Sequence, residues 1–263
     1  MPEIDRLKGK QFAATLSHGI ALLRAFAPDT PSLRNRELVE RTGLGPATVS
    51  RLAFTLVSLG LLDHDRKRRT YRIAPGVLRI GYPLLASMHV RQFARPFMME
   101  LASAVRGTVG IGVRHQIEMV YLDAVVDHDG PNPMIDRGMP IPLMTSAMGN
   151  AWLGAATAAE REKAMNLQRI QLPALHAKYA ARAMAAVREF RNKGYCWNVG
   201  YRLGDRVNVA AALHRRLDGE LVIFNCTVLA RSATPIEEEA ARLGPLLLQM
   251  LRRVESAAGI DQV

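Results

Sequence analysis

Hydroxyl and guanidinium side chains that could recognise DNA cluster in one short stretch. Thr48, Ser50 and Arg51 are residue types that hydrogen-bond to base edges and phosphates, and arginine pairs well with guanine. A run of four cations follows, Arg66-Lys67-Arg68-Arg69, which suits phosphate contacts or a narrow minor groove. These residues, together with Arg34, are the candidate contacts with double-stranded DNA.

The residues around these side chains predict two helices joined by a turn. Residues 34–42 are good helix formers anchored by Leu38 and Val39, and Gly43 can take the positive φ that ends a helix. Pro46 suits the first turn of the second helix, where a missing N–H costs nothing. Helical spacing places an apolar stripe against the core at Val49, Leu52, Ala53, Leu56 and Leu59. The opposite face, with Thr48 on its flank, can then enter a major groove.

A strand pair around the cation run predicts a wing. Leu61-Leu62 and Tyr71-Arg72-Ile73 are short apolar runs on either side of the four cations. An isolated run of this kind is usually a solvated charged hairpin. Because this one directly follows a helix-turn-helix, we interpret it as a DNA-contacting wing, and residues 1–74 as a winged helix-turn-helix domain.

Two segments resemble a known family. The run TGLGPATVSRLAFTLVSLGLL resembles the signature of IclR-type transcriptional regulators at Thr48, Arg51, Leu52, Leu56 and Gly60-Leu61. Residues 137–155, RGMPIPLMTSAMGNAWLGA, resemble the mouth of that family's effector pocket. Gly138, Pro142, Leu143, Ser146, Gly149 and Ala151 fit, whereas Asn150 replaces the usual lysine. The resemblance implies a GAF-like effector-binding domain at residues 89–263, joined to the head by a linker helix at residues 75–88.

A small carboxylic acid is the expected ligand of that second domain. Free N–H groups at a helix N-terminus near Ala147, Met148 and Gly149 could hold a carboxylate. Asn208 shares a strand face with Ala210, and polar residues in apolar strands orient small ligands. With the positions that the resemblance adds, the candidate effector-binding residues are Ser146, Ala147, Met148, Gly149, Asn198, Asn208, Asn225 and Thr227.

The chain departs from the family pattern after Gly194-Tyr195. The resemblance leads us to expect acidic residues there, but the chain has Cys196-Trp197-Asn198-Val199-Gly200-Tyr201. Loss of anionic groups should ease the binding of an acid, and aromatic walls suit a planar ring. The pattern resembles the branch that controls aromatic-acid catabolism. The alternative is that Asn208 and Asn225 only hydrogen-bond within the strands and that the pocket is vestigial.

The second half alternates helical and strand patterns, which predicts an α+β fold with an antiparallel sheet. Helix signals include a capping box at Thr157 and Glu160, a stop at Gly194, and a start at Thr234, Pro235 and Glu237. Asp218-Gly219 is a strong hairpin signal. Strands are expected at 108–113, 118–126, 195–202, 207–214 and 221–229. Helices are expected at 12–26 and 172–193, and the helix that starts at Thr234 should run to about residue 258. A further helical stretch at 75–106 is expected to be interrupted near Pro83 and Pro96.

Charge and composition favour a polyanion partner for the head. Residues 1–80 contain 14 Lys or Arg and 7 Asp or Glu, an excess of +7 out of the chain's net +11, which leaves +4 for the longer remainder. The polar segment 1–10 is no signal peptide, and no apolar run approaches the roughly 18 residues of a membrane span. We therefore expect a cytoplasmic protein.

The sequence gives little support for catalysis. Seven histidines are scattered without metal-ligand spacing, and Cys196 and Cys226 form no CxxC pair. Asp127-His128-Asp129 is interpreted as a charged turn rather than a metal corner. We expect no cofactor and no metal. The alternatives are an enzyme acting on a small acid with a DNA-binding head, and an architectural nucleic-acid-binding protein.

The function that these observations favour is a regulator of a catabolic operon. A dimer, or a dimer of dimers, would bind a pseudo-palindromic operator, because one head contacts too few base pairs to be selective. Binding of the acid would alter the geometry of the paired heads. The identity of the acid, the operator sequence and the sign of regulation are not encoded in any motif.

Overall fold

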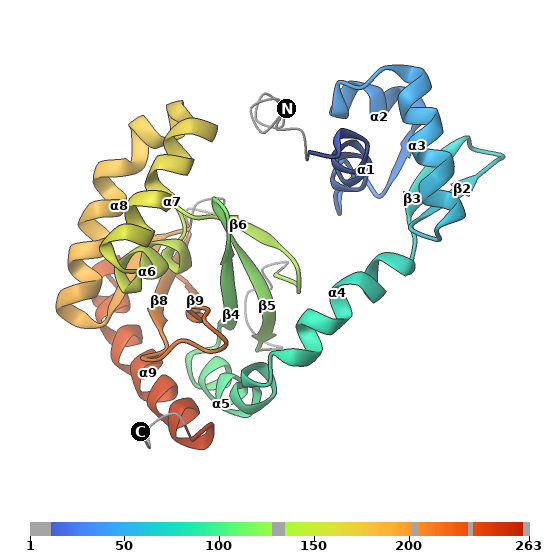
Figure 1. Cartoon of the computed structure of the whole chain (residues 1–263). Helices are drawn as coiled ribbons and strands as arrows, with labels where there is room; N and C mark the ends of the chain where they lie inside the picture. The colour runs from blue at the N-terminus through green and yellow to red at the C-terminus, as the bar shows by residue number, and fades with distance from the viewer. Residues whose placement is uncertain (1–11, 128–134, 201–204, 231–233, 260–263) are drawn as a thin grey trace. The chain divides into compact units, whose positions relative to one another are not determined.

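The computed structural model describes residues 12–127, 135–200, 205–230 and 234–259. The chain divides into two compact units, Met1–Ser87 and Met88–Val263, here called the head and the body. Figure 1 labels the elements of each unit. The head contains α1 (Ala14–Arg24), β1 (Ser32–Arg34), α2 (Asn35–Thr42), α3 (Pro46–Ser58), β2 (Leu62–Asp65), β3 (Thr70–Ile73) and α4 (Gly76–Ser87).

The head has the expected helix-turn-helix, closed over a small core. Gly43 ends α2 with a φ of 67°, and Pro46 opens α3, as predicted. Leu22 of α1 packs in one cluster with the apolar stripe of α3, in which Val49 is fully buried. The prediction for Leu59 was wrong. It is 65% exposed because α3 ends at Ser58 and the next residue no longer follows the helical stripe.

The wing is a sheet of three strands rather than two. Its order is β1-β3-β2, and all pairs are antiparallel. The strand β1 was missed by the sequence analysis because it is only three residues long. Its central residue, Leu33, is buried in the head core and ties the wing to the helices.

The expected interruptions at two prolines were wrong. Pro83 lies inside α4, and Pro96 lies inside α5, which spans Val90–Val105. Each proline removes one backbone donor without ending its helix. The break falls instead at residues 88–89, where the two units meet in the sequence.

The body is built on a six-stranded antiparallel sheet. Its order is β6-β5-β4-β9-β8-β7. The strands are β4 (Thr108–His115), β5 (Glu118–Val126), β6 (Pro140–Pro142), β7 (Tyr195–Val199), β8 (Arg206–Ala212) and β9 (Ile223–Leu229). The turn before β9 forms at Asp218-Gly219, both of which have positive φ, as that dipeptide predicted. The β8 and β9 strands are shorter than expected, and Tyr201 and Arg202 lie outside the described residues.

Helices cover both faces of this sheet (Figure 1). On one face α6 (Ala147–Ala155) lies on the strands, backed by α7 (Ala158–Gln171) and α8 (Pro173–Lys193). On the other face lie α5 and α9 (Ile236–Ala257). Successive side chains of β7 point to opposite faces of the sheet. The ring of Tyr195 packs on Gly244 of α9, whereas the thiol of Cys196 lies 3.5 Å from the carbonyl oxygen of Ala147.

The helix ends agree with the sequence in two places and differ in one. Thr157 and Glu160 form the predicted capping box of α7, and Gly194 ends α8 with a φ of 78°. The final helix begins at Ile236 with Pro235 at its N-cap, and no side chain caps it. The prediction of Thr234 as the cap of a capping box was therefore wrong. The α+β fold class itself is confirmed.

Candidate functional site

One candidate site is the exposed face of α3 in the head. Arg51 and Ser50 are exposed there, and Thr48 is half-buried at the edge of the face. The hydroxyl of Ser50 accepts a 2.9 Å hydrogen bond from the side-chain amide of Asn35. This contact fixes Ser50 against α2. The guanidinium of Arg51 makes no ion pair with any residue that the structure describes, so its donors are available to another molecule.

The tip of the wing is held by a carboxylate. Asp65 accepts hydrogen bonds from the backbone N–H groups of Lys67 (2.9 Å) and Arg68 (3.0 Å). The hydrogen bond from Arg68 has the largest effect and, with the bond from Lys67, lowers the pKa of Asp65. The side chain of Asp65 is therefore ionised at neutral pH. Arg66, Lys67 and Arg69 are exposed, and in the described head none of them is ion-paired. The wing therefore presents uncompensated positive charge.

Arg34 lies between the two parts of this surface. Its backbone N–H donates to the Glu37 carboxylate at 2.6 Å, which starts α2. Arg34 pairs with Thr70 in the wing sheet, and its own side chain is exposed. The eight residues predicted to contact DNA thus lie on α3, at the wing tip and at the β1–α2 junction of one unit.

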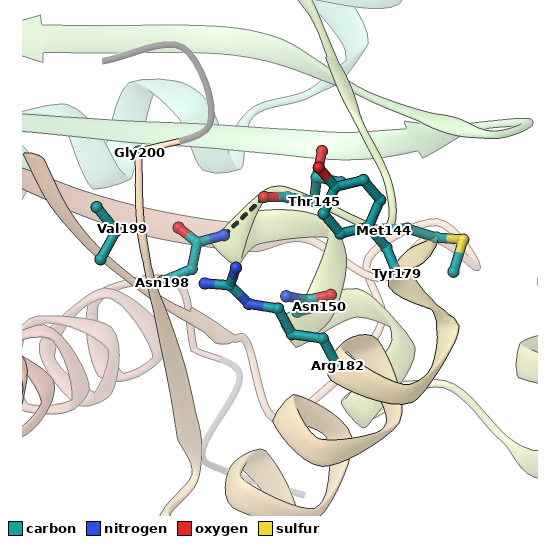
Figure 2. Close-up of a pocket in the computed structure, with 8 residues that line it drawn as sticks. All are labelled: Met144, Thr145, Asn150, Tyr179, Arg182, Asn198, Val199 and Gly200. Carbon is teal, nitrogen blue, oxygen red and sulfur yellow. Dashed lines mark hydrogen bonds between the residues drawn. The ribbon is translucent and has the colours of Figure 1, made fainter. Parts of the chain in front are cut away.

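A second candidate site is a cavity of about 200 Å³ in the body. Three elements form it: the N-terminal part of α6 with the turn before it, the middle of α8, and the end of β7 (Figure 2). The side-chain amide of Asn198 donates a 2.8 Å hydrogen bond to the carbonyl oxygen of Thr145. The lining residues are Met144, Thr145, Asn150, Tyr179, Arg182, Asn198, Val199 and Gly200.

The charge of this cavity comes from Arg182. Within the part of the chain that the structure describes, no Asp or Glu lines the cavity and Arg182 makes no ion pair. Figure 2 shows its side chain reaching from α8 toward the side of Asn198 and Thr145. Sequence reasoning missed Arg182 and Tyr179. Their i, i+3 spacing on an alanine-rich helix was the one available signal that they share a face.

Two residues that line the cavity each carry a buried polar atom without a protein partner. Asn150 is 3% exposed and Thr145 is 9% exposed, yet Asn150 Oδ1 and Thr145 Oγ1 receive no hydrogen bond within the described structure. Leaving such an atom unpaired costs about 1–3 kcal/mol. Both residues line the cavity, but these two atoms are themselves buried and are not exposed to it.

The N-terminus of α6 is shaped by Ser146 and Gly149. Ser146 Oγ accepts the Gly149 N–H at 3.0 Å and donates to the Pro142 carbonyl at 2.7 Å. A Cβ on Gly149 would lie 1.9 Å from the carbonyl oxygen of Leu143, so only glycine permits this approach. Ser146 and Gly149 therefore shape the start of α6, but neither is among the residues that line the cavity, and the amide of Gly149 is already bonded. Ala147 and Met148 are buried against the sheet.

The remaining predicted residues form a polar row on the same face of the sheet. Asn225 Nδ2 donates to Thr227 Oγ1 at 3.1 Å, and Thr227 Oγ1 donates to Asn208 Oδ1 at 2.6 Å. Asn208 pairs in register with Asn198, so the row leads from the centre of the sheet to the cavity. The side chains of Asn225 and Tyr121 both lie against Gly110. A Cβ at this position would clash with the Tyr121 ring and with Asn225 Oδ1. Burial raises the pKa of Tyr121 and keeps it neutral.

No second kind of site emerges from the described residues. Those residues contain no cluster of His, Cys, Asp and Glu that could hold a metal, and His128 and Asp129 of the predicted charged turn lie outside them. Both cysteines are unpaired and buried, and burial raises the pKa of each thiol. Across the same described ranges, no helix combines the length and apolarity that a membrane span requires.

Comparisons with known proteins agree with this geometry. Residues 15–66 match the IclR helix-turn-helix domain, and residues 83–254 match the domain described as bacterial transcriptional regulator IclR C-terminal. The HTH-type transcriptional regulator TsaQ1/TsaQ2 of Comamonas testosteroni is 28% identical over 257 residues, which are 97% of this chain and 92% of the relative.

Solved structures have the same fold. An IclR family transcriptional regulator from Brucella abortus is 32% identical with a TM-score of 0.80, and the match covers 95% of this chain and 94% of that one. An IclR homologue from Microbacterium hydrocarbonoxydans, solved with 4-hydroxybenzoate, has the same fold with a TM-score of 0.69. It is 19% identical over 92% of this chain and 98% of its own.

Proposed function

The chain belongs to the IclR family of bacterial transcriptional regulators, and we propose that it controls a catabolic operon in response to a small carboxylic acid. The single observation that carries the choice of ligand is the cavity between α6, α8 and β7. Among the described residues, it is lined by one guanidinium that makes no ion pair and by no carboxylate. The carboxylate of an acid that enters the cavity would pair with this guanidinium and would not be repelled by a carboxylate side chain.

On the DNA side, we assign base recognition to α3 and phosphate contact to the wing. Arg51 and Thr48 stand at the exposed N-terminal half of α3, the part of a recognition helix that reaches base edges. The wing residues Arg66, Lys67, Arg68 and Arg69 would contact the DNA backbone. Ser50 adds a hydroxyl on α3 itself, and Arg34 adds a cation at the β1–α2 junction. Because Arg68 lies 3.9 Å from Asp65, it contributes less free charge than its neighbours.

On the ligand side, an aromatic acid is the class that we favour. The cavity volume of about 200 Å³ is below the roughly 300–1,000 Å³ of drug-sized sites, so it suits one ring or a short chain. Tyr179 and Met144 supply apolar walls. The 4-hydroxybenzoate complex of the Microbacterium homologue supports the same class, because its fold is shared.

We also propose that the active form is a homodimer or a pair of dimers. Large apolar side chains stand exposed on two helices of the head, which a second copy could cover. They are Leu16 and Ile20 on α1, and Leu78, Ile80, Tyr82 and Leu84 on α4. Sedimentation analysis of the full chain and of Leu78→Asp tests this. A dimer that dissociates in the variant supports the proposal, and a monomeric wild-type protein contradicts it.

The alternatives fit less well. The family and the matched relatives are regulators of transcription, not enzymes. An architectural nucleic-acid-binding protein would bind DNA through salt-dependent charge contacts with no preference for sequence. That alternative does not explain the polar row and the cavity in the body.

The test uses the full chain and two independent measurements. Fragments of the genome are selected by the protein, and the enriched fragment is compared with shuffled DNA of the same composition. Separately, the melting temperature is recorded with small aliphatic and aromatic carboxylates. An acid present at about 100 times its dissociation constant should stabilise the body by roughly 2.7 kcal/mol. Equal binding of all DNA sequences, or the absence of a thermal response to any acid, contradicts the corresponding half of the proposal.

A further inference from the structure

Phe54 is the largest apolar residue exposed on α3. It is 73% exposed, so its ring lies in water when the head is free. A single exposed apolar residue is common on protein surfaces and has no meaning by its size alone. The position of Phe54 distinguishes it. At about 100° per residue it lies in the middle of the exposed face of α3, between Ser50 and Arg51 and opposite the stripe that packs in the head core.

The hydroxyl groups that follow Arg51 on α3 are used within the helix. Thr55 Oγ1 donates a 3.0 Å hydrogen bond to the backbone carbonyl of Arg51, and Ser58 Oγ donates a 3.0 Å hydrogen bond to the carbonyl of Phe54 itself. Each hydroxyl has one proton to donate, so neither offers it to a base edge while these bonds are made. Beyond Ser50, the outer face of α3 therefore presents a guanidinium and an aromatic ring.

The charge of this helix favours a nucleic acid as the partner of that ring. Arg51 is the one ionisable residue in the sequence of α3, and it makes no ion pair with a described residue. No carboxylate stands on α3 to repel phosphates, and the four cations of the wing belong to the same unit. The apolar residues that we assign to contact with a second copy lie on other helices, α1 and α4.

Thymine is the base that presents an apolar group in the major groove. Its 5-methyl group stands at the groove edge, and phenylalanine is one of the side chains that pack on it. Arg51 and Phe54 are three residues apart, so they share a face with a rise of about 4.5 Å along the helix. Successive base pairs are separated by roughly 3.4 Å. The ring of Phe54 therefore reaches a base pair one or two positions from the one that Arg51 contacts.

We infer that Phe54 is a specificity residue of the head, whose ring packs on the 5-methyl group of a thymine near the base that Arg51 reads. This inference rests on the proposed function and deepens it, because it adds apolar recognition of one base to polar recognition of another. Binding removes both the ring and the methyl group from water. That burial favours thymine over a base without the methyl group at this position.

Replacement of thymine by deoxyuridine tests the inference, because it removes the methyl group and leaves base pairing unchanged. Each thymine of the DNA fragment that the protein selects is replaced in turn, and the dissociation constant of the full chain is measured by anisotropy. At least one replacement should weaken binding about fourfold, which is the effect of burying one methyl group. A selected fragment in which no replacement weakens binding overturns the inference.

Variants connect the methyl group to Phe54. Phe54→Ala should bind the thymine and deoxyuridine duplexes equally, whereas Phe54→Leu keeps an apolar side chain and should retain part of the preference. Leu59→Ala is the control, because it removes an apolar group that is 65% exposed just after the end of α3, and it should keep the full preference. Because Phe54 is exposed, its replacement should leave the melting temperature unchanged.

Two results for Phe54→Ala contradict the inference. One is a preference for the methyl group as large as that of the wild type. The other is equal weakening on both duplexes together with a smaller oligomer in sedimentation analysis, because the ring would then contact a second copy of the chain.

Shuffled DNA of the same composition separates this inference from the proposed function. Selective binding of the chosen fragment without any response to deoxyuridine rejects the role of Phe54 alone. Equal binding of the chosen fragment and shuffled DNA rejects the proposed function of the head, and the inference with it.

Discussion

The side-chain amide of Asn198, on the edge strand β7, donates a 2.8 Å hydrogen bond to the carbonyl oxygen of Thr145, in the turn before α6. Both residues are buried, and they are 53 positions apart in the sequence. The bond joins two of the three elements that form the cavity. The shape of the cavity therefore depends on an asparagine at the place where the family pattern leads one to expect acidic residues.

Asn198→Leu should weaken ligand binding without unfolding the body. Loss of the amide leaves the Thr145 carbonyl buried and unpaired, which costs about 1–3 kcal/mol of the free energy of unfolding. We expect the affinity for 4-hydroxybenzoate to fall about tenfold because the turn before α6 is no longer fixed. Denaturant unfolding and calorimetry measure the two effects. The matched change Asn166→Leu, at an exposed position of α7, should leave the affinity as it is. Unchanged affinity in Asn198→Leu would argue against this cavity as the binding site.

Arg51→Ala and Lys67→Ala should weaken DNA binding in different ways. If Arg51 reads a base edge, its loss should cost about 1–3 kcal/mol on the selected operator and little on shuffled DNA. Loss of a phosphate contact at Lys67 should weaken both DNAs alike and lower the salt slope by about 1. Anisotropy titrations at several salt concentrations distinguish these outcomes. Arg169→Ala removes one exposed charge from the body as the control. Equal losses on both DNAs for Arg51→Ala would reduce it to a phosphate contact.

Gly149→Ala should destabilise the body. The added methyl group would lie 1.9 Å from the Leu143 carbonyl oxygen, so either α6 or the preceding turn must move. Overpacking of this kind costs about 3 kcal/mol. Gly138→Ala is the comparison, because nothing lies within 4 Å of a Cβ there and only the backbone strain of its positive φ remains. Thermal unfolding of the two variants measures the difference. Equal stability of Gly149→Ala and the wild type would contradict the close approach.

The two thiols should be unreactive in the folded protein. Burial raises the pKa of Cys226 to about 12 and that of Cys196 well above its usual range, so neither forms appreciable thiolate near neutral pH. Both are shielded from reagents by the sheet and the helices on it. Labelling with a maleimide should be slow in buffer and complete in denaturant, as followed by mass spectrometry. Rapid labelling of the native protein would place a thiol outside the core.

Local signals in the sequence predicted much of the fold. Gly43, Pro46, Gly194 and the Asp218-Gly219 turn each act within a few residues, so the sequence alone determines their effect. The errors have local causes as well. The strand β1 is too short to show a period, and the helices α4 and α5 continue through their prolines.

The candidate site was less predictable because it depends on tertiary packing. Asn198 lines the cavity as expected, but Asn208, Asn225 and Thr227 bond to one another beside it. Arg182 and Tyr179 carry no motif. Their place in the cavity follows from the packing of α8 on α6, which no spacing in the sequence states.

Coupling between ligand binding in the body and DNA binding in the head is measured on the full chain. The dissociation constant for the selected operator is measured by anisotropy with and without saturating 4-hydroxybenzoate, for the wild type, Arg182→Gln and the control Arg188→Gln, at an exposed position of α8 that does not line the cavity. The acid should change DNA affinity by a factor of roughly 5–150 in the wild type and in Arg188→Gln, and Arg182→Gln should lose this response while still binding DNA. The same DNA affinity with and without bound acid would contradict a ligand-responsive regulator.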